Sequence, residues 1–317
     1  MNRPSVKLAQ VLGTLFLALA GQPGDFAFCA TTNLIPVADT MIMEVAPSNN
    51  AGGLAWLTAG GNHYGVPSRG LLKFDIAGSI AAGSKITAAS LDLWVTQVPG
   101  DGYAVGYFGL HRLLRGWGEG TNNPANAPGQ GSPATTNEAT WLSPFALTTN
   151  TWNAPGAAAT NDYYPAATAV RIVYDVAQSP YTFPDPSDDA APMIADIQRW
   201  LDHPATNFGW IFICESETVP NTTRRFASRE DPNTPPSLHV TYVVPPRIDS
   251  VEKLGGQFRL HFTAQAGQAY TVQFCNALAT SNVWSTLTNL DAPPAATNVV
   301  IGDPSSSRQR FYRLMTY

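Results

Sequence analysis

The chain has 317 residues, of which 44% are hydrophobic and 13% are charged, and this charged share is about half that of an average globular protein. The apolar residues suffice for a buried core, while glycine and proline, with 26 residues each, favour many short strands over long helices. A net charge of -5 excludes the broad basic surface that binds a nucleic acid backbone, so we expect no nucleic acid partner.

The N-terminal segment has the pattern of an export signal. Arg3 and Lys7 precede an apolar run over residues 8–20 that is too short to span a membrane. Small residues that suit a signal peptidase occur at the end of this run and again near Ala30, so both cleavage points stay open. We therefore expect a secretion signal within residues 1–30, no membrane span, and a mature protein that is secreted or held at the cell surface.

Short alternating patterns predict the first strands of an all-β domain. Strands are expected over residues 36–43 and 54–59, joined as a hairpin by the turn-rich segment 47–53. Two further strands follow, and their core-facing side chains are predicted to be Leu72, Phe74, Ile76, Leu91, Leu93 and Val95. The alternate positions of these strands face water, and they include the large aromatic ring of Trp94.

A long segment without regular patterning follows a strand expected over residues 106–114. It covers residues 116–168, is rich in Asn, Thr, Pro, Ala and Gly, and is interpreted as a loop region that is either functional or a solvated insertion. Its tryptophans, Trp117, Trp141 and Trp152, are expected to pin it to the underlying domain, because packing is the more common role of a large aromatic side chain.

The last part of this domain combines strands with one convincing helix. A strand is expected from alternation at Val170, Ile172, Tyr174 and Val176. Asp188 or Asp189 then caps an amphipathic helix whose apolar stripe is Met193, Ile194, Ile197, Trp200 and Leu201. Residues 208–214 are apolar almost throughout, as in a strand buried on both faces, and residues 237–243 form the final alternating strand.

Proline-rich residues 244–246 form an extended linker to a second domain, which covers residues 245–317. Its strands are expected over residues 258–262, 270–274 and 311–314. The sequence therefore predicts an all-β chain, with a β-sandwich and one short helix over residues 31–244, followed by a small second β domain.

Six motifs lie between residues 36 and 244. They are Asp39-Thr40-Met41-Ile42, the turn Pro47…Asn50…Gly52, Arg69-Gly70-Leu71-Leu72-Lys73-Phe74-Asp75, Ile86…Ala89…Leu91-Asp92-Leu93, Asn207-Phe208-Gly209-Trp210 and Ser228-Arg229-Glu230…Pro235-Pro236-Ser237-Leu238…Val240…Tyr242. With these motifs the segment resembles the DNRLRE domain family, which comprises jelly-roll-like β-sandwich modules of secreted bacterial and archaeal proteins. The resemblance implies a jelly-roll-like fold and, because some members are carbohydrate-binding modules for alginate, an acidic polysaccharide ligand. Residues 267–313 are similar to small β modules of verrucomicrobial type that end secreted proteins.

Several aromatic and polar residues are candidates for a sugar-binding surface, which needs an aromatic plate beside groups that read hydroxyls or carboxylates. Trp94, Asp92 and Lys73 on the outward strand faces provide this combination. The other candidates are His63, Tyr64, Tyr103, Tyr107, Tyr163 and Tyr164. We therefore predict a secreted, non-catalytic module that binds extracellular polysaccharide, with alginate-like acidic glycans as the favoured class.

Charged residues of the motifs allow a structural and a metal-binding interpretation. Arg69, Asp75 and the pair Arg229-Glu230 could form charge-assisted hydrogen bonds at strand ends. Asp39, Glu44 and Asp75 could instead supply oxygen ligands to a structural Ca²⁺. No other cofactor is expected, because no Cys/His cluster with zinc spacing is present.

Two other functional classes stay open. In a polysaccharide lyase, His63 or Tyr64 would act as the base while Arg69 neutralises a uronate carboxylate. No catalytic motif supports this chemistry, so we predict that the protein is not an enzyme. A structural or adhesive surface protein fits the low charge equally well, and its C-terminal domain would then attach it to the cell envelope.

Overall fold

The computed structural model of the protein describes residues 29–123, 130–276, 284–304 and 309–316. The chain forms two compact units, one comprising Phe28–Pro245 and the other including Pro246–Tyr317, and each is described by itself. Both units are built of antiparallel strands, so the prediction of an all-β chain is confirmed. None of the helices in the described ranges is long and apolar enough to cross a membrane.

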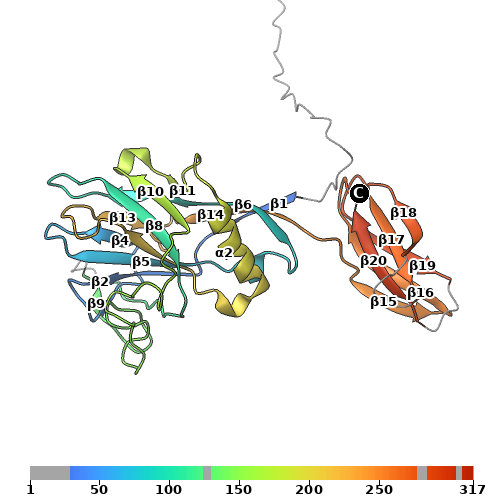
Figure 1. Cartoon of the computed structure of the whole chain (residues 1–317), viewed down its shortest axis with the longest axis horizontal. Coiled ribbons are helices and arrows are strands. Elements are labelled where there is room, and N and C mark those ends of the chain that lie inside the picture. The colour runs from blue at the N-terminus through green and yellow to red at the C-terminus, as the bar shows by residue number, and fades with distance from the viewer. Residues whose placement is uncertain (1–28, 124–129, 277–283, 305–308, 317) are drawn as a thin grey trace, which may run out of the picture. The chain divides into compact units, whose positions relative to one another are not determined.

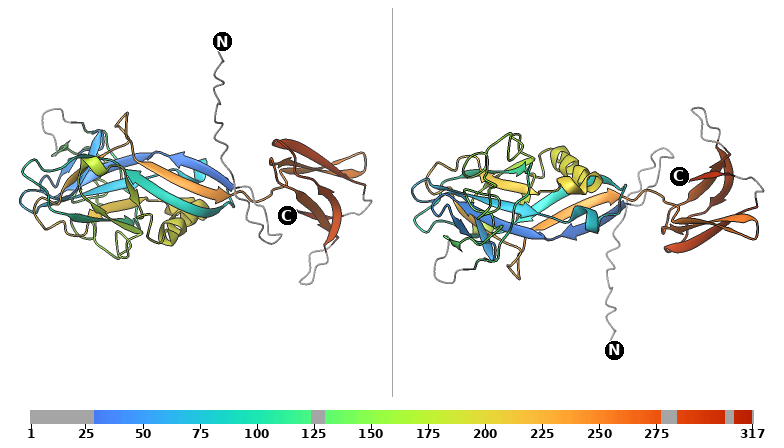
Figure 2. Two further views of the ribbon diagram at one scale, coloured as in Figure 1. Left: turned by 90° about the horizontal axis from the view of Figure 1, so that it is seen from above. Right: turned by 90° about the horizontal axis from the view of Figure 1, so that it is seen from below.

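Two antiparallel sheets form the first unit, a β-sandwich with its core between them (Figure 1, Figure 2). The smaller sheet has the order β1 (Cys29–Leu34), β14 (Ser237–Val243), β6 (Lys85–Leu93) and β11 (Tyr181–Phe183). The larger sheet has the order β10 (Ala169–Val173), β8 (Gly106–Arg112), β12 (Trp210–Cys214), β5 (Pro67–Lys73), β4 (Trp56–Gly61), β13 (Arg224–Ala227) and β7 (Val95–Gln97), and β2 (Ala38–Met43) pairs with β5. The remaining elements are the pair β3 (Asn49–Asn50) and β9 (Ser132–Pro133), the helices α1 (Ile76–Ser79) and α2 (Ala191–Asp202), and the 3-10 turns η1 (Val176–Gln178) and η2 (Pro204–Thr206).

The core between the sheets is aromatic where β12 crosses it. Trp210 and Phe212 of β12 are fully buried, and the ring centroid of Phe212 lies 5.4 Å from that of Phe108 on β8. Ile211 and Ile213, on the other face of β12, are buried in a second cluster. The apolar run predicted for this segment therefore reflects a strand that is covered on both faces.

The described part of the insertion, residues 116–168, covers the outer face of the larger sheet. Trp141 and Trp152 are buried against the isoleucines of β12. Trp117 is half-buried, and its ring nitrogen donates a hydrogen bond of 2.9 Å to the carbonyl oxygen of Phe208. The prediction that these tryptophans pin the insertion to the sandwich is therefore confirmed.

Helix α2 lies beside β6 and packs its apolar stripe into the core. At its start, the carboxylate of Asp189 accepts a hydrogen bond of 2.8 Å from the backbone N–H of Ala191. The buried side chains of the helix are Met193, Asp196, Ile197, Trp200 and Leu201. Asp196 is the charged exception in this stripe, and a buried carboxylate needs partners.

The predicted hairpin of the first two strands is wrong. β2 pairs with β5 over Ala38–Met43, whereas β4 pairs mainly with β13. β2 pairs along one edge of β5 from Ser68 to Lys73, whereas β12 pairs along the opposite edge, which β4 joins only at Gly60 and Gly61. The turn-rich segment marks a reversal of the chain, but it does not determine which strand becomes the partner.

The strand predicted from Val170 onward corresponds to β10, but β10 is shorter than the predicted pattern. β10 ends at Val173, and its residues Ala169 and Val173 are buried in the core. Ile172 is half-buried, and Tyr174 is exposed. The predicted positions Val170 and Ile172 therefore alternate with the core-facing Ala169 and Val173, and Val176 lies in the turn η1.

The second unit holds two three-stranded sheets. The first has the order β15 (Ser250–Leu254), β16 (Gln257–Ala264) and β19 (Thr297–Asp303), and the second has the order β18 (Ser285–Leu290), β17 (Tyr270–Cys275) and β20 (Phe311–Thr316). Their core is Leu260, Phe262, Ala264, Tyr270, Val272 and Leu314. β16, β17 and β20 correspond to the three predicted strands, whereas β15 escaped prediction because all its residues are exposed.

Candidate functional site

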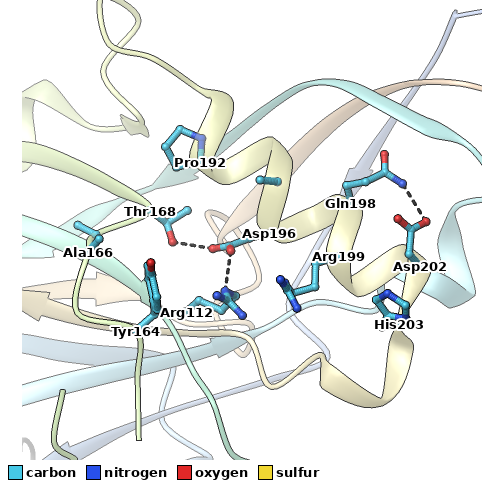
Figure 3. A pocket seen from close by; sticks show the side chains of 12 residues that line it. Arg112, Tyr164, Ala166, Thr168, Pro192, Asp196, Gln198, Arg199, Asp202 and His203 are labelled. Carbon is cyan, nitrogen blue, oxygen red and sulfur yellow. Dashed lines mark hydrogen bonds and ion pairs between the residues drawn. The ribbon is translucent and has the colours of Figure 1, made fainter. Parts of the chain in front are cut away.

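A cavity of about 600 Å³ opens between α2 and residues 164–168 of the insertion (Figure 3). Its charged and aromatic lining consists of Arg112, Tyr164, Asp196, Arg199, Asp202 and His203. These residues come from the end of β8, from the insertion and from the second half of α2 with the residue that follows it. The cavity is therefore assembled by the fold from segments that are distant in the sequence.

The carboxylate of Asp196 joins three other parts of the chain. Its Oδ2 accepts a hydrogen bond of 2.6 Å from the Thr168 hydroxyl and one of 3.0 Å from the Trp210 ring nitrogen. Its Oδ1 lies 2.8 Å from Nε of Arg112 in an ion pair. Asp196 is 8% exposed, and these partners compensate for its burial.

The guanidinium of Arg112 is held between Asp196 and Tyr164. Its Cζ lies 5.3 Å from the centroid of the Tyr164 ring, within cation–π range. Neither terminal nitrogen of Arg112 donates a hydrogen bond to another residue of the described ranges, and Tyr164 is 49% exposed. The cavity therefore presents an oriented cation beside an accessible aromatic ring.

A second guanidinium, that of Arg199, projects from the last turn of α2 toward the same space (Figure 3). Arg199 is exposed and forms no ion pair with any residue that the structure describes. Asp202, one turn further on, accepts a hydrogen bond of 3.0 Å from the Gln198 side chain. The cavity thus contains two guanidinium groups, and that of Arg199 has no counter-charge within the described chain.

Four charged residues of this cavity, Arg112, Asp196, Arg199 and Asp202, are absent from the sequence predictions. Asp196 has a recognisable signal, because it lies on the apolar stripe of the helix beside Ile197, where a charged residue must be paired. The arginines carry no such signal, since exposed charged residues are common in any chain. Tyr164 was among the predicted loop aromatics.

The predicted trio of Trp94, Asp92 and Lys73 does not form one surface. Asp92 lies on β6 and Lys73 on β5, which belong to different sheets, and the outer faces of a sandwich point in opposite directions. Asp92 also accepts a hydrogen bond of 2.6 Å from the Thr182 hydroxyl and lies 3.1 Å from the His239 ring. Trp94 is half-buried between β6 and β7. Alternation indicates which side of a strand is outward, but not which sheet contains it.

The other predicted aromatics lie in two separate places. His63 lies 3.2 Å from the carboxylate of Asp101 at a cavity of about 270 Å³, and its neighbour Tyr64 is 82% exposed. Tyr103 and Tyr107 lie before and on β8, which pairs with β10. These four residues therefore do not form a single aromatic plate.

Arg69 was predicted either to form charge-assisted hydrogen bonds within the fold or to neutralise a uronate carboxylate. In the structure it forms charge-assisted hydrogen bonds within the fold. Its guanidinium forms two hydrogen bonds with Glu217, of 2.6 and 3.1 Å, and lies over the ring of Trp141. The bidentate ion pair ties the segment after β12 to β5, and the contact with Trp141 together with hydrogen bonds to the carbonyl oxygens of Gly156 and Ala157 ties the insertion to the sheet. His63 and Tyr64 are not among the partners of Arg69, and His63 pairs instead with Asp101.

The predicted calcium ligands Asp39, Glu44 and Asp75 do not come together. Glu44 is exposed just after β2. Asp75 accepts a hydrogen bond of 2.9 Å from the backbone N–H of Gly78 and caps α1, so Ile76 begins a helix instead of continuing the predicted strand. Of the three, only Asp39 lies near other carboxylates.

Asp39, Glu119 and Glu230 form a cluster whose carboxylate oxygens lie within 4.8 Å of one another. Arg229 lies among them, since its guanidinium bonds Glu119 at 2.6 Å and its backbone N–H donates to Asp39 at 2.7 Å. Carboxylate oxygens suit a hard cation such as Ca²⁺. In the described chain, the guanidinium of Arg229 supplies positive charge to the same group.

Burial raises the pKa of Asp39 well above its usual value, and it also raises the pKa of Glu119. The folded state therefore binds protons more tightly at these groups, so their contribution to stability falls as pH rises from about 4 through the raised pKa of Asp39. We expect Asp39→Asn to flatten this decline and to raise the free energy of unfolding near neutral pH by about 1 kcal/mol. Asparagine keeps the acceptor for the Arg229 N–H and adds a donor among the carboxylates. Urea unfolding in chelator at mildly acidic and mildly alkaline pH measures the difference.

Glu44→Gln is the matched control, because Glu44 is an exposed carboxylate near the same strand. It is expected to leave the pH dependence of unfolding unchanged. An Asp39→Asn protein that is less stable than the wild type at both pH values would contradict a net penalty for the buried carboxylate.

No family model matches the chain, and no curated protein matches it. The function is therefore inferred from the groups, distances and exposure of the cavity in Figure 3.

Proposed function

We propose that the first unit is a non-catalytic module that binds acidic polysaccharide, and that the cavity of Figure 3 is its binding site. The observation that carries this proposal is the pair of guanidinium groups, Arg112 and Arg199, beside the exposed ring of Tyr164. A guanidinium matches a carboxylate in bidentate geometry, and a tyrosine ring packs against the apolar face of a sugar. A uronate residue presents both features at once.

Binding without catalysis agrees with the partners of the two carboxylates in the cavity. Asp196 is bonded by three groups, and Asp202 accepts a hydrogen bond from Gln198. A glycosidase needs one carboxyl group that donates a proton and a second that acts as base or nucleophile. Carboxylates that are committed to partners within the chain favour a binding role.

The motif resemblance supports the same proposal. Asp39 and Arg229 belong to two different motifs, and the backbone N–H of Arg229 donates a hydrogen bond to Asp39. Arg69, from a third motif, pairs with Glu217. Residues of the motifs therefore join distant segments of the sandwich. We assign the first unit, within this proposal, to the DNRLRE domain family. We further propose that the protein acts outside the cell on extracellular polysaccharide and that the second unit attaches it to the envelope.

Arg199→Ala is expected to weaken binding of alginate about tenfold, which corresponds to about 1.4 kcal/mol. The side chain is exposed and has no ion pair with a described residue, so its removal takes a cation from the cavity without breaking an internal contact. A charge-assisted hydrogen bond to a carboxylate is worth this amount. Affinity electrophoresis of the full chain in gels that contain alginate measures the change.

Lys85→Ala is the matched control, because Lys85 is exposed on β6, carries the same charge and does not line the cavity. Gels with a neutral polysaccharide test whether the ligand must be charged. If no polysaccharide retards the wild-type chain, sugar binding fails, and a structural or adhesive role in which the sandwich displays its loops becomes the better proposal.

A further inference from the structure

A second cavity, of about 400 Å³, lies against the first unit at β10. The side chains that give it its chemistry are Tyr107, Arg171, Ile172, Tyr174, Gln178 and Asp188. Tyr107 of β8 and Ile172 of β10 are paired in register, so their side chains lie next to each other on one face of the sheet. The floor of this cavity is therefore partly apolar and partly aromatic.

The insertion leaves this part of the outer sheet face open. Trp141 and Trp152 cover the isoleucines of β12, whereas Tyr107 is 51% exposed and Tyr174 also reaches solvent. Accessible tyrosine rings on a strand face are the kind of surface that packs against a pyranose ring. The second cavity thus offers a stacking surface that the core does not use.

Hydrogen-bonding groups surround the same floor. The side chains of Gln178 and Asp188 form no hydrogen bond or ion pair within the described ranges, so both can bond the hydroxyls of a ligand. Arg171 pairs with Asp185 and lies over the ring of Tyr181, so its charge is already balanced. The second cavity suits the ring and hydroxyls of a sugar, whereas the first suits its carboxylate.

The two cavities follow each other along one strand. Thr168 lines the first and Ile172 lines the second, and in an extended strand these residues are separated by about 13 Å. β10 is the outermost strand of its sheet, and β8 is its only paired neighbour in the described chain. We propose that one glycan chain runs along this edge, with a carboxylate in the first cavity and a sugar ring on Tyr107 in the second. This inference rests on the proposed function and deepens it, because the ligand becomes a stretch of several sugar units.

Isothermal titration of the full chain with alginate oligouronates of increasing length tests the proposal. Wild-type affinity is expected to rise with length until both cavities are filled. Tyr107→Ala is expected to leave the shortest bound oligomer unaffected and to weaken the longest by about fivefold, the usual range for an aromatic contact. Arg199→Ala is expected to weaken every length, because it alters the first cavity.

Tyr64→Ala is the matched control, since Tyr64 is an exposed tyrosine that lines neither cavity. Its affinities are expected to equal those of the wild type, and melting curves of all variants confirm that they fold. The proposal that one glycan chain occupies both cavities is overturned if Tyr107→Ala binds oligomers of every length like the wild type. It is also overturned if Tyr107→Ala lowers the affinity for all lengths equally. Absence of binding by the wild type at every length overturns the proposed function itself, which is a distinct result.

Discussion

Replacement of Arg224 by methionine is expected to lower the free energy of unfolding of the first unit by about 3 to 5 kcal/mol. Arg224 of β13 is 0% exposed, and no carboxylate of the described ranges forms an ion pair with it. Its guanidinium donates instead to the backbone carbonyl oxygens of Ala104, Val173, Tyr174, Asn221, Thr222 and Thr223. Urea unfolding followed by tryptophan fluorescence measures the loss, since every tryptophan except Trp284 lies in the first unit.

The size of this effect follows from what the carbonyl groups lose. Methionine fills a similar volume but donates no hydrogen bond, and each buried acceptor left without a donor costs about 1 kcal/mol or more. Removal of the charge offsets part of this loss in the free energy of unfolding. Burial lowers the pKa of Arg224, which means that the buried cation is itself unfavourable. The carbonyl groups of Val173 and Tyr174 lie at the end of β10, so the variant is also expected to loosen the second cavity.

Arg225→Met is the matched control, because successive residues of β13 point to opposite faces. The guanidinium of Arg225 lies 4.7 Å from the ring centroid of Trp56 and donates to the side chain of Gln97. Loss of these surface contacts is expected to cost under about 1 kcal/mol. Equal losses at the two arginines would contradict the assignment of a large contribution to the buried carbonyl bonds.

Local patterns predicted the elements of this fold better than their partners. β14 and the apolar stripe of α2 agree with prediction, because alternation and helical spacing act within a few residues. β5 pairs with β2 along one edge and with β12 and β4 along the other, and the pattern of no single strand contains this information. Arg224 and Arg225 show the same limit, since three of the carbonyl groups that bond Arg224, those of Ala104, Val173 and Tyr174, belong to distant segments.

The candidate site was harder to predict, because its charged groups meet only in the folded chain. Tyr164 was recognised as an accessible aromatic, and Asp196 had a signal in its place on the apolar stripe. Arg112 and Arg199 become significant only when β8 and α2 are brought together around Asp196. The predicted trio around Trp94 failed for the complementary reason, since strands that are neighbours in the sequence belong to different sheets.

Asp196→Ala is expected to lower the free energy of unfolding by about 3 kcal/mol, the usual cost of breaking a buried ion pair. The substitution removes the acceptor of the Thr168 hydroxyl and the Trp210 ring nitrogen and the ion-pair partner of the Arg112 guanidinium. It also releases Arg112 from the position in which it lines the cavity, so alginate binding is expected to weaken as well. Urea unfolding and affinity electrophoresis of one preparation measure the two effects.

Asp202→Asn is the matched partner of this variant, because Asp202 is exposed in the same cavity and its side chain bonds only Gln198 within the described chain. Asparagine keeps an acceptor, so stability is expected to stay unchanged. Loss of the negative charge is expected to strengthen binding of an acidic glycan by about twofold to threefold, within the range of an exposed charge pair, and to leave a neutral glycan unaffected. Weaker binding of the acidic glycan would contradict the role of the guanidinium groups. Opposite signs at the two carboxylates are expected because Asp196 positions a guanidinium, whereas Asp202 places an exposed negative charge in the cavity that repels an acidic ligand.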